Sequence, residues 1–213
     1  MSDDKPLCIY AQVKKIPQLV RIRYTRSNEK FRMDITTMKW QNKPLVWSTQ
    51  SDTIKIASDQ KTDFWRQTHY GFIRDNGHFY YKDVKGDFIA EVKVSGQYKE
   101  LYDQAGLMVR LDEANWLKCG IEFIEGVQQV SAVVTRDYSD WSVAPLSHNP
   151  SSVWMRVTRR GPALEVHYSL EGEKYTMLRM AYLTSVETLS VGVMCASPDG
   201  NGFSTTFEGF KVG

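Results

Sequence analysis

The sequence predicts an all-β fold, built as an antiparallel sandwich or barrel. Apolar and polar residues alternate along most of the chain, which is the pattern of half-buried strands. The helical spacing of apolar residues at i, i+3, i+4 and i+7 is nearly absent from the sequence. Turn signals such as "VKGD" at 84–87 and "LEGEK" at 170–174 separate the alternating segments. Many short strands with frequent turns are typical of sandwiches and barrels.

The alternation predicts strands along almost the whole chain. In chain order their ranges are 7–13, 19–24, 31–36, 53–57, 69–74, 78–83, 87–94, 105–111, 116–124, 128–135, 153–159, 163–169, 175–182, 189–196 and 203–211. The segment "DNGH" at 75–78 predicts a tight hairpin, because both central residues of a type I′ turn need positive φ. The stretch "DYSDWSVAPLSHNPS" at 137–151 is predicted to be a long loop, and long ordered loops are often functional.

Composition and charge describe an ordinary globular protein. The chain has 213 residues, of which 42% are hydrophobic, so one domain with a sizeable core is expected. The net charge is only +2, which gives no reason to expect nucleic acid or an anionic membrane as a partner. The first residues, "MSDDKP", carry acids where a signal peptide needs positive charge, and no run approaches the length of a membrane span. We therefore expect a cytoplasmic protein.

The cysteines suit a reducing compartment. Cys8, Cys119 and Cys195 are odd in number and widely spaced, which is neither a disulfide framework nor a zinc pattern. Cys119 and Cys195 fall on the apolar side of predicted strands, so we expect core thiols. The four histidines show no metal-ligand spacing, and no cofactor motif is present. Asp199 and Asn201 could hold calcium, but a plain turn is the better interpretation of "SPDGNG".

The segment "DQAGLMVRLDEANWLKCGIEF" at 103–123 predicts a hairpin whose register can be derived. If the apolar residues of both strands share the core, the core pairs and the outward pairs are fixed, because a slip of one residue would bury Arg110. The core pairs are Val109 with Leu117, Leu107 with Cys119 and Ala105 with Ile121. The outward pairs are Arg110 with Trp116, Met108 with Lys118, Gly106 with Gly120 and Gln104 with Glu122.

This outward face predicts either a ligand site or a covered surface. Arg110 can stack on Trp116 as a cation–π pair, and the paired glycines leave room for a ligand or another backbone. An aromatic platform beside charged groups suits a polar ring such as a sugar. The alternative is an outer face laced with ion pairs and covered by a loop. "VWMRVTR" and "ALEVHYSL" add Trp154, Arg156 and His167 on polar sides, which favours one concave face rich in Trp, Arg and Lys.

Several stretches together resemble a known but uncharacterised family. They are "MKWQNKPLVW" (38–47), "TDFWRQTHYGFIRDNGHFYY" (62–81), "YDQAGLMVRLDEANWLKCGIEF" (102–123), "SAVVTRDYSDWS" (131–142), "VWMRVTRRG" (153–161) and "SLEGEKYTMLRMAYL" (169–183). The family looks like concanavalin A-like lectins and glucanases, and it includes the fungal regulation of enolase protein. The resemblance implies a concanavalin A-like jelly-roll β-sandwich of two antiparallel sheets, a cytoplasmic setting and a role in regulating enolase.

The resemblance also bears on the domain boundaries and on the site. We expect one domain over residues 1–213, in which 38–212 form the family-like core and the basic segment 1–37 is an N-terminal extension or added strands. The family motifs add the loop residues Asp140 and Trp141 to the face derived above. His69 could bind ligand too, although an ordinary half-buried histidine is the stronger interpretation. The candidate ligand-binding residues are Arg66, His69, Gln104, Arg110, Trp116, Lys118, Glu122, Asp140, Trp141, Trp154 and Arg156.

The spacing of the acids argues against a glycoside hydrolase without excluding one. Lectin-like glucanases place acids at alternate positions of one strand, so that the side chains point the same way. Glu122 and Glu125 are three residues apart, and so are Asp137 and Asp140, which sends each pair to opposite faces. Glu122 could still meet Asp103 or Asp140 across strands.

These observations lead to one hypothesis for function and two alternatives. The hypothesis is a non-catalytic binding or regulatory protein, whose lectin-like groove takes a carbohydrate or a sugar-phosphate-like anion. The first alternative is a carbohydrate-active enzyme that resembles glycoside hydrolases. The second is a pure protein-interaction module with enolase as its partner, acting through the basic N-terminal segment or the stretch 137–151.

Overall fold

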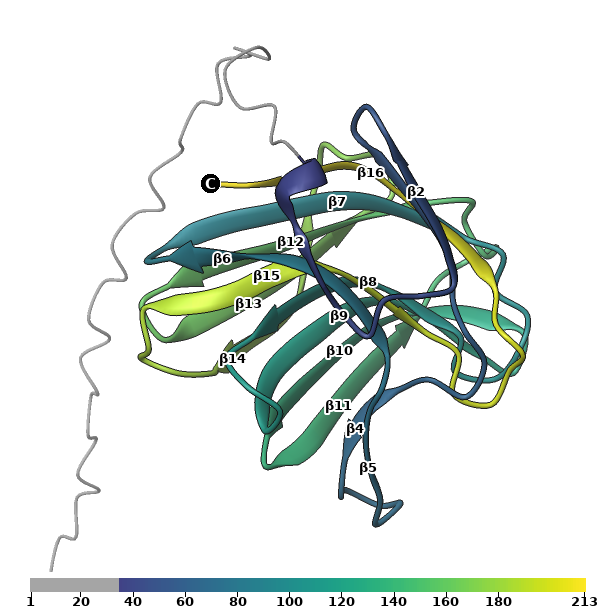
Figure 1. Cartoon of the computed structure of the whole chain (residues 1–213), viewed down its shortest axis with the longest axis horizontal. Coiled ribbons are helices and arrows are strands. Elements are labelled where there is room, and N and C mark those ends of the chain that lie inside the picture. The colour runs from purple at the N-terminus through teal and green to yellow at the C-terminus, as the bar shows by residue number, and fades with distance from the viewer. Residues whose placement is uncertain (1–34) are drawn as a thin grey trace, which may run out of the picture. The chain divides into compact units, whose positions relative to one another are not determined.

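The computed structural model describes residues 35–213 as a β-sandwich with a small hairpin beside it (Figure 1). The expectations for the segment before residue 35, including strands 7–13 and 19–24 and the interpretation of Cys8, lie outside the described residues. At the end of the predicted strand 31–36, a short 3-10 helix, η1, spans Ile35–Thr37 instead. Within 35–213, no helix is long and apolar enough to cross a membrane.

Two seven-stranded antiparallel sheets form the sandwich. The first sheet contains, in spatial order, β1 (Lys39–Gln41), β6 (His78–Lys85), β15 (Thr188–Ala196), β8 (Gln104–Arg110), β9 (Asn115–Ile124), β10 (Val127–Arg136) and β11 (Tyr138–Pro145). The second sheet contains β14 (Thr176–Tyr182), β13 (Ala163–Ser169), β12 (Val153–Arg160), β7 (Phe88–Gly96), β16 (Ser204–Val212), β3 (Thr53–Ala57) and β2 (Val46–Gln50). The chain crosses repeatedly between the sheets, which confirms the predicted all-β jelly-roll sandwich.

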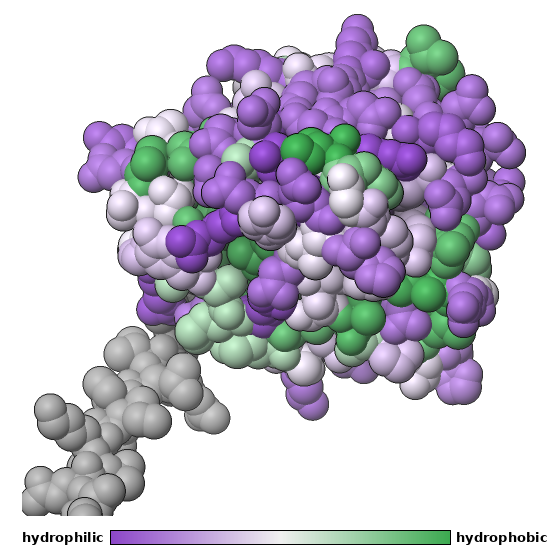
Figure 2. Space-filling view, turned by 90° about the horizontal axis from the view of Figure 1, so that it is seen from below, coloured by the Kyte–Doolittle hydropathy of each residue, from purple (hydrophilic) through white to green (hydrophobic). Residues whose placement is uncertain are grey.

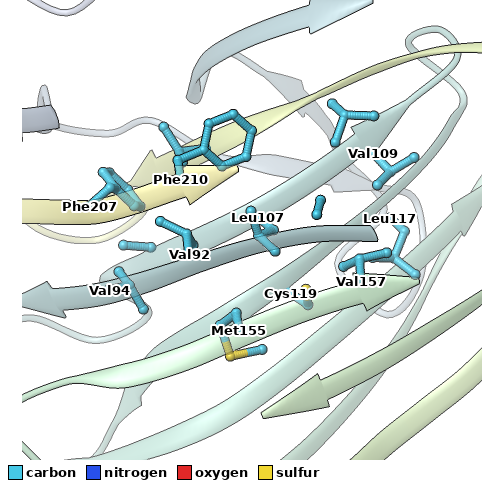
Figure 3. Packing of buried hydrophobic residues seen from close by; sticks show 14 of the residues in the cluster. Val92, Val94, Leu107, Val109, Leu117, Cys119, Met155, Val157, Phe207 and Phe210 are labelled. Carbon is cyan, nitrogen blue, oxygen red and sulfur yellow. The ribbon is translucent and has the colours of Figure 1, made fainter. Parts of the chain in front are cut away.

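The core lies between the two sheets and follows the predicted alternation. On β12, Val153, Met155 and Val157 are fully buried, while the residues between them face outward. Side chains of both sheets interdigitate here, as Figure 3 shows for residues of β7, β8, β9, β12 and β16. Cys119 and Cys195 are buried free thiols, as expected. Burial raises the pKa of Cys119 to about 12 and also raises that of Cys195, so both thiols are unreactive.

The register of the β8–β9 hairpin is the one derived from the sequence. Arg110 pairs with Trp116, Met108 with Lys118, Gly106 with Gly120 and Gln104 with Glu122. The glycine pair is required by a close backbone approach, because a Cβ on Gly106 would lie 2.0 Å from the carbonyl oxygen of Cys119. A Cβ on Gly120 would meet the carbonyl oxygen of Ala105 at the same distance.

Four strands have no counterpart among the predicted ranges: β1, β2, β11 and β4 (Phe64–Arg66). The stretch 137–151, predicted as a loop, contains the eight-residue edge strand β11. Its two serines, its aspartate and its final proline are typical of a loop, but an edge strand with one exposed side tolerates such residues.

The predicted hairpin at 75–78 is also wrong. Strand β5 (Ile73–Asp75) pairs with β4, whereas β6 joins the first sheet, so Asn76 and Gly77 connect two different sheets. The backbone N–H groups of both residues donate to the carbonyl oxygen of Asp63. Gly77 is needed for another reason than positive φ, because a Cβ there would lie 2.4 Å from the ring of Phe64. The predicted strand at 69–74 is mostly the tip of the β4–β5 hairpin.

Candidate functional site

The β4–β5 hairpin covers part of the outer face of the first sheet. A second apolar cluster forms between them, separate from the core of the sandwich. Its buried members are Phe64, Trp65, Phe79, Met108, Trp116, Val133 and Met194. Trp116 is completely buried in this cluster, and its ring meets that of Phe64 edge to face at 6.3 Å. The alternative derived from the sequence, an outer face covered by a loop, is therefore correct for Trp116.

Charged groups hold the hairpin on the sheet at both ends. The guanidinium of Arg110 donates to both carboxylate oxygens of Asp75, at 2.7 and 2.8 Å. The side chain of Arg66 donates to the carbonyl oxygen of Asp137 at 3.2 Å, and its backbone N–H donates to the hydroxyl of Ser139 at 2.9 Å. Arg66 and Arg110 thus anchor the hairpin.

A third anchor is Lys118, which is 5% exposed. Its Nζ donates to the carbonyl oxygen of Phe64 at 2.7 Å and lies 3.5 Å from Oδ1 of Asp63. The cation over the Trp116 ring is also Lys118, at 5.8 Å from the ring centroid. The expected stacking of Arg110 on Trp116 is replaced by this contact, because Asp75 draws Arg110 toward the hairpin, where it lies 6.0 Å from the Phe64 ring.

Beside the hairpin lies a cavity of about 140 Å³, which we call the hairpin pocket. Its walls are the aromatic residues Trp65, Tyr70, Phe72, Tyr102 and Trp141, and its polar lining is Asp63, Arg74, Gln104, Lys118, Glu122 and Asp199, with Pro198 at the edge. Trp141 stands perpendicular to Trp65 at 6.3 Å and at 78° to Tyr102 at 6.2 Å. The walls therefore form a box of crossed rings. Figure 2 views the molecule from the side on which β4 and β5 project in Figure 1, where hydrophobic and pale residues mix with hydrophilic ones.

Glu122 forms part of the pocket floor and is held by two donors. Its Oε2 accepts from the hydroxyl of Ser131 at 2.7 Å and from the indole N–H of Trp141 at 2.8 Å. Burial raises the pKa of Glu122, and the nearby charge of Lys118 offsets only part of this effect. The two hydrogen bonds fix both the carboxylate and the wall ring of Trp141.

Two phenols meet at the rim of the pocket. The hydroxyls of Tyr70, from the hairpin tip, and Tyr102, from the loop before β8, lie 3.1 Å apart. This hydrogen bond, together with partial burial, raises the pKa of Tyr102 to about 12. Tyr102 has a φ of 67°, an uncommon value for an aromatic residue. The backbone conformation that places the Tyr102 ring at the rim is therefore energetically unfavourable.

Asp103 organises the loops that complete the rim. It is fully buried, and its Oδ2 accepts from the backbone N–H groups of Lys99 and Glu100 at 2.9 and 3.0 Å. Its Oδ1 accepts from the hydroxyl of Ser197 at 2.5 Å. The first loop carries Tyr102, and the second continues into Asp199, so Asp103 is a positioning residue for the pocket.

The structure brings four of the predicted site residues into the pocket: Gln104, Lys118, Glu122 and Trp141. Arg66, in β4 of the hairpin itself, and Arg110, on the first sheet, are anchors, and Trp116 lies buried under the hairpin. His69 lies on the exposed hairpin tip, against the ring of Tyr70. Asp140 is exposed and forms an ion pair at 2.7 Å with Arg179 of β14, which links the edges of the two sheets.

Trp154 and Arg156 do not share a face with Arg110, so this grouping was wrong. Both lie on β12 of the second sheet and point away from the core. The guanidinium of Arg156 lies 3.5 Å from the centroid of the Tyr175 ring and pairs with the buried carboxylate of Glu91. Glu91 also accepts from Lys211 at 2.7 Å. The alternation in the sequence indicates that these side chains face outward, but it does not indicate which of the two sheets contains their strand.

Most of the pocket lining was not among the candidates. The missed residues are Asp63, Trp65, Tyr70, Phe72, Arg74, Tyr102, Pro198 and Asp199. For the missed residues of the hairpin, between 63 and 74, the family motif around "WRQTHYG" at 65–71 was the signal in the sequence. Within the described residues, no group of three or more His, Cys, Asp or Glu side chains is placed to hold a metal ion.

Comparisons with known proteins agree with this architecture. Residues 40–213 match the family described as "Protein of unknown function (DUF1349)". The "Regulation of enolase protein 1" of Saccharomyces cerevisiae is 39% identical over 173 residues, which cover 81% of this chain and 87% of that protein. An uncharacterised protein of Emericella nidulans is 26% identical over 157 residues, 69% of this chain and 78% of that one.

Solved structures extend the likeness. A functionally unknown protein from Saccharomyces cerevisiae has a TM-score of 0.82 and 37% identity, over 85% of this chain and 98% of that one. The carbohydrate-binding module CBM66 of Bacillus subtilis has a TM-score of 0.54 and 11% identity, over 83% of this chain and 96% of that one. The GH43 protein BlXynB of Bacillus licheniformis has a TM-score of 0.63 and 16% identity, over 81% of this chain but 36% of that one. These last two show a shared fold.

Proposed function

Because this chain belongs to the DUF1349 family of proteins of unknown function, we propose a role for it from its pocket: it is a carbohydrate-binding protein without catalytic activity. The hairpin pocket takes one sugar ring. The observation that carries the proposal is the box of crossed rings around a polar floor, formed by Trp65, Trp141 and Tyr102 above Glu122 and Lys118. Aromatic faces cover the C–H groups of a sugar, and the polar floor orients its hydroxyls.

The pocket is held in place before any ligand binds. Trp141 is fixed by its hydrogen bond to Glu122, and the hairpin that carries Trp65 is fixed by Arg110 and Lys118. Groups that need no reordering lose little entropy on binding, which favours affinity. The likeness of the fold to a carbohydrate-binding module supports the proposal at the level of architecture.

Catalysis is disfavoured by the contacts of the pocket acids. A glycoside hydrolase needs two carboxyl groups that flank the scissile bond as acid and as base or nucleophile. Here Oε2 of Glu122 accepts from Ser131 and Trp141. Oδ1 of Asp63 accepts from the backbone N–H of Phe64 at 2.7 Å. One oxygen of each carboxylate thus serves to hold the site together.

A ligand screen by NMR tests the proposal. The panel is glucose, galactose, mannose and N-acetylglucosamine, and the readout is the indole N–H signals of the tryptophans. We expect at least one sugar to shift the signals of Trp65 and Trp141 and to leave that of Trp154, on the other sheet, unchanged. No shift for any sugar, or equal shifts at all three positions, would contradict the proposal.

A matched pair of variants locates the binding site. Trp141→Ala removes a wall of the hairpin pocket, and Trp154→Ala removes a partly exposed tryptophan from the second sheet. We expect Trp141→Ala to weaken binding about tenfold, the loss of one aromatic contact, and Trp154→Ala to leave it unchanged. Equal effects of the two substitutions would place the sugar elsewhere.

A second candidate function follows from the yeast relative, which is named as a regulator of enolase. We propose that this chain binds enolase in the cytoplasm through the exposed edges of the two sheets. Large apolar side chains are exposed there, namely Tyr138 and Val143 on β11 and Met180 and Tyr182 on β14. The ion pair between Asp140 and Arg179 joins these edges into one surface. Such exposed apolar residues suit a protein partner.

A binding assay with purified yeast enolase tests this candidate. We expect the full chain to bind and Tyr138→Asp to abolish binding, while Asp52→Asn, another surface change, has no effect. Removing residues 1–30 should leave binding unchanged; loss of binding would move the contact to the basic N-terminal segment. No binding by the full chain would contradict the candidate.

A further inference from the structure

The pocket acids have unused acceptor atoms. Oε2 of Glu122 accepts two hydrogen bonds, but its Oε1 accepts none from the described residues. Oδ1 of Asp63 accepts from the N–H of Phe64 and lies 3.5 Å from Nζ of Lys118, while its Oδ2 has no hydrogen-bond partner in residues 35–213. Both carboxylates line the pocket, so their free oxygens are available to a ligand.

Two further lining residues add acceptors. Gln104 donates through Nε2 to the carbonyl oxygen of Tyr102 at 3.2 Å, which leaves its Oε1 available. Asp199 is exposed at the rim, and its carboxylate has no ion pair or hydrogen bond with another described residue. Acceptors therefore surround the pocket from floor to rim.

The lining has two basic residues, Lys118 and Arg74, and the ammonium of Lys118 is largely occupied. Lys118 already donates to the carbonyl oxygen of Phe64 and lies beside Asp63, so its charge is balanced within the protein. The guanidinium of Arg74 lies 4.6 Å from the centroid of the Phe72 ring, at the pocket wall. The lining thus holds three acids, Asp63, Glu122 and Asp199, against two bases.

We infer that the hairpin pocket selects an uncharged, hydroxyl-rich sugar and rejects phosphorylated sugars. The inference rests on the proposed function and names the class of sugar. Sugar hydroxyls can donate to the free oxygens of Asp63, Glu122 and Gln104, whose acceptor capacity would otherwise stay unused. A phosphate group, as the dianion, has acceptors only, so where it replaces a hydroxyl it leaves the facing oxygen unpaired and meets the negative charge of these acids.

Calorimetric titration with matched sugars tests the inference. The probes are glucose, galactose, mannose and N-acetylglucosamine, each beside its own 6-phosphate. We expect at least one neutral sugar to bind, and its 6-phosphate to bind at least about tenfold more weakly. Equal or tighter binding of the 6-phosphate would overturn the inference and leave the proposed function intact. Binding of no probe at all would overturn the proposed function, and the inference with it.

A rim variant separates charge from shape. Asp199→Asn removes one negative charge at the pocket, and Glu171→Gln removes an exposed charge from the loop between β13 and β14. Since Asp199 is exposed, neither change should disturb folding, which circular dichroism can check. We expect Asp199→Asn to reduce the preference for the neutral sugar about threefold, and Glu171→Gln to leave it unchanged. An unchanged preference in Asp199→Asn would contradict the electrostatic basis of the selection.

Discussion

Arg110 and Asp75 form a two-point ion pair between the first sheet and the β4–β5 hairpin, with N–O distances of 2.7 and 2.8 Å. The Arg110 side chain is 10% exposed and that of Asp75 is 30% exposed. A paired guanidinium and carboxylate in such a setting are geometrically specific. Without Asp75, the charge of Arg110 would stay mostly buried and unpaired, so the contact governs how firmly the hairpin holds to the sheet.

Asp75→Asn should therefore lower the free energy of unfolding by about 3 kcal/mol, the cost of removing one partner of a largely buried pair. Asp83→Asn is the matched control, because Asp83 pairs with Lys39 at 3.3 Å on an exposed surface. There we expect a loss of about 0.5 kcal/mol. Urea unfolding followed by circular dichroism measures both values, and equal losses would contradict the anchoring role of Asp75.

Trp116→Ala should lower the free energy of unfolding by about 4 kcal/mol, because the ring is completely buried beneath the hairpin. Tyr138→Ala, at a residue that is 64% exposed, should change it by less than about 0.5 kcal/mol. Thermal unfolding of the three proteins gives the comparison. A small effect of Trp116→Ala would contradict the structural role of this buried ring.

Glu122 should make stability fall as the pH rises. Its pKa is raised in the folded protein above the usual 4.5, so the folded state holds the proton more tightly than the unfolded state. The unfavourable contribution is absent below pH 4.5, grows as the pH rises through the folded pKa, and is complete above it. Glu122→Gln removes this contribution, so the variant should gain stability relative to the wild type between pH 4 and pH 8, in urea titrations at several pH values. Curves that stay parallel would contradict the raised pKa.

Glu91 should have the opposite effect. Burial by itself raises its pKa, but the hydrogen bonds and charges of Lys211 and Arg156 outweigh burial and lower it below 4.5. Its stabilising contribution is therefore complete above pH 4.5 and is lost as the pH falls through the folded pKa. Glu91→Gln should cost about 2 kcal/mol at pH 7, less than in a fully buried pair because Arg156 and Lys211 are partly exposed. At acid pH the difference from the wild type should shrink, and a constant difference would contradict this assignment.

The sandwich and the β8–β9 register could be predicted because they depend on local alternation. Each strand of 104–122 has one apolar side and one polar side, so only one register buries the apolar sides together. The position of the hairpin could not be predicted in this way. Strands β4 and β5 have three residues each, too few to show a period, and their contacts are with distant residues such as Arg110 and Lys118.

The candidate site could be predicted only in part, for a related reason. Lys118, Glu122 and Gln104 were found because they share one face of one hairpin. Trp154 and Arg156 were assigned to the same face in error, because a sandwich has two outer faces and alternation describes both equally well. Tyr102 and Asp199 lie in loops, where no periodicity indicates a direction, and only the folded chain brings them to the rim.

Lys118 has a further consequence for genetics. The same ammonium forms the floor of the pocket and closes the hairpin onto the sheet through the carbonyl oxygen of Phe64. A random-mutagenesis search for loss of binding would therefore return many changes at floor positions that simply fail to accumulate as folded protein. Substitutions that weaken binding but leave the amount of folded protein unchanged should lie at the rim, at exposed positions such as Asp199 and Tyr70. Under the proposed function, substitutions at those positions should change sugar preference without loss of the folded protein.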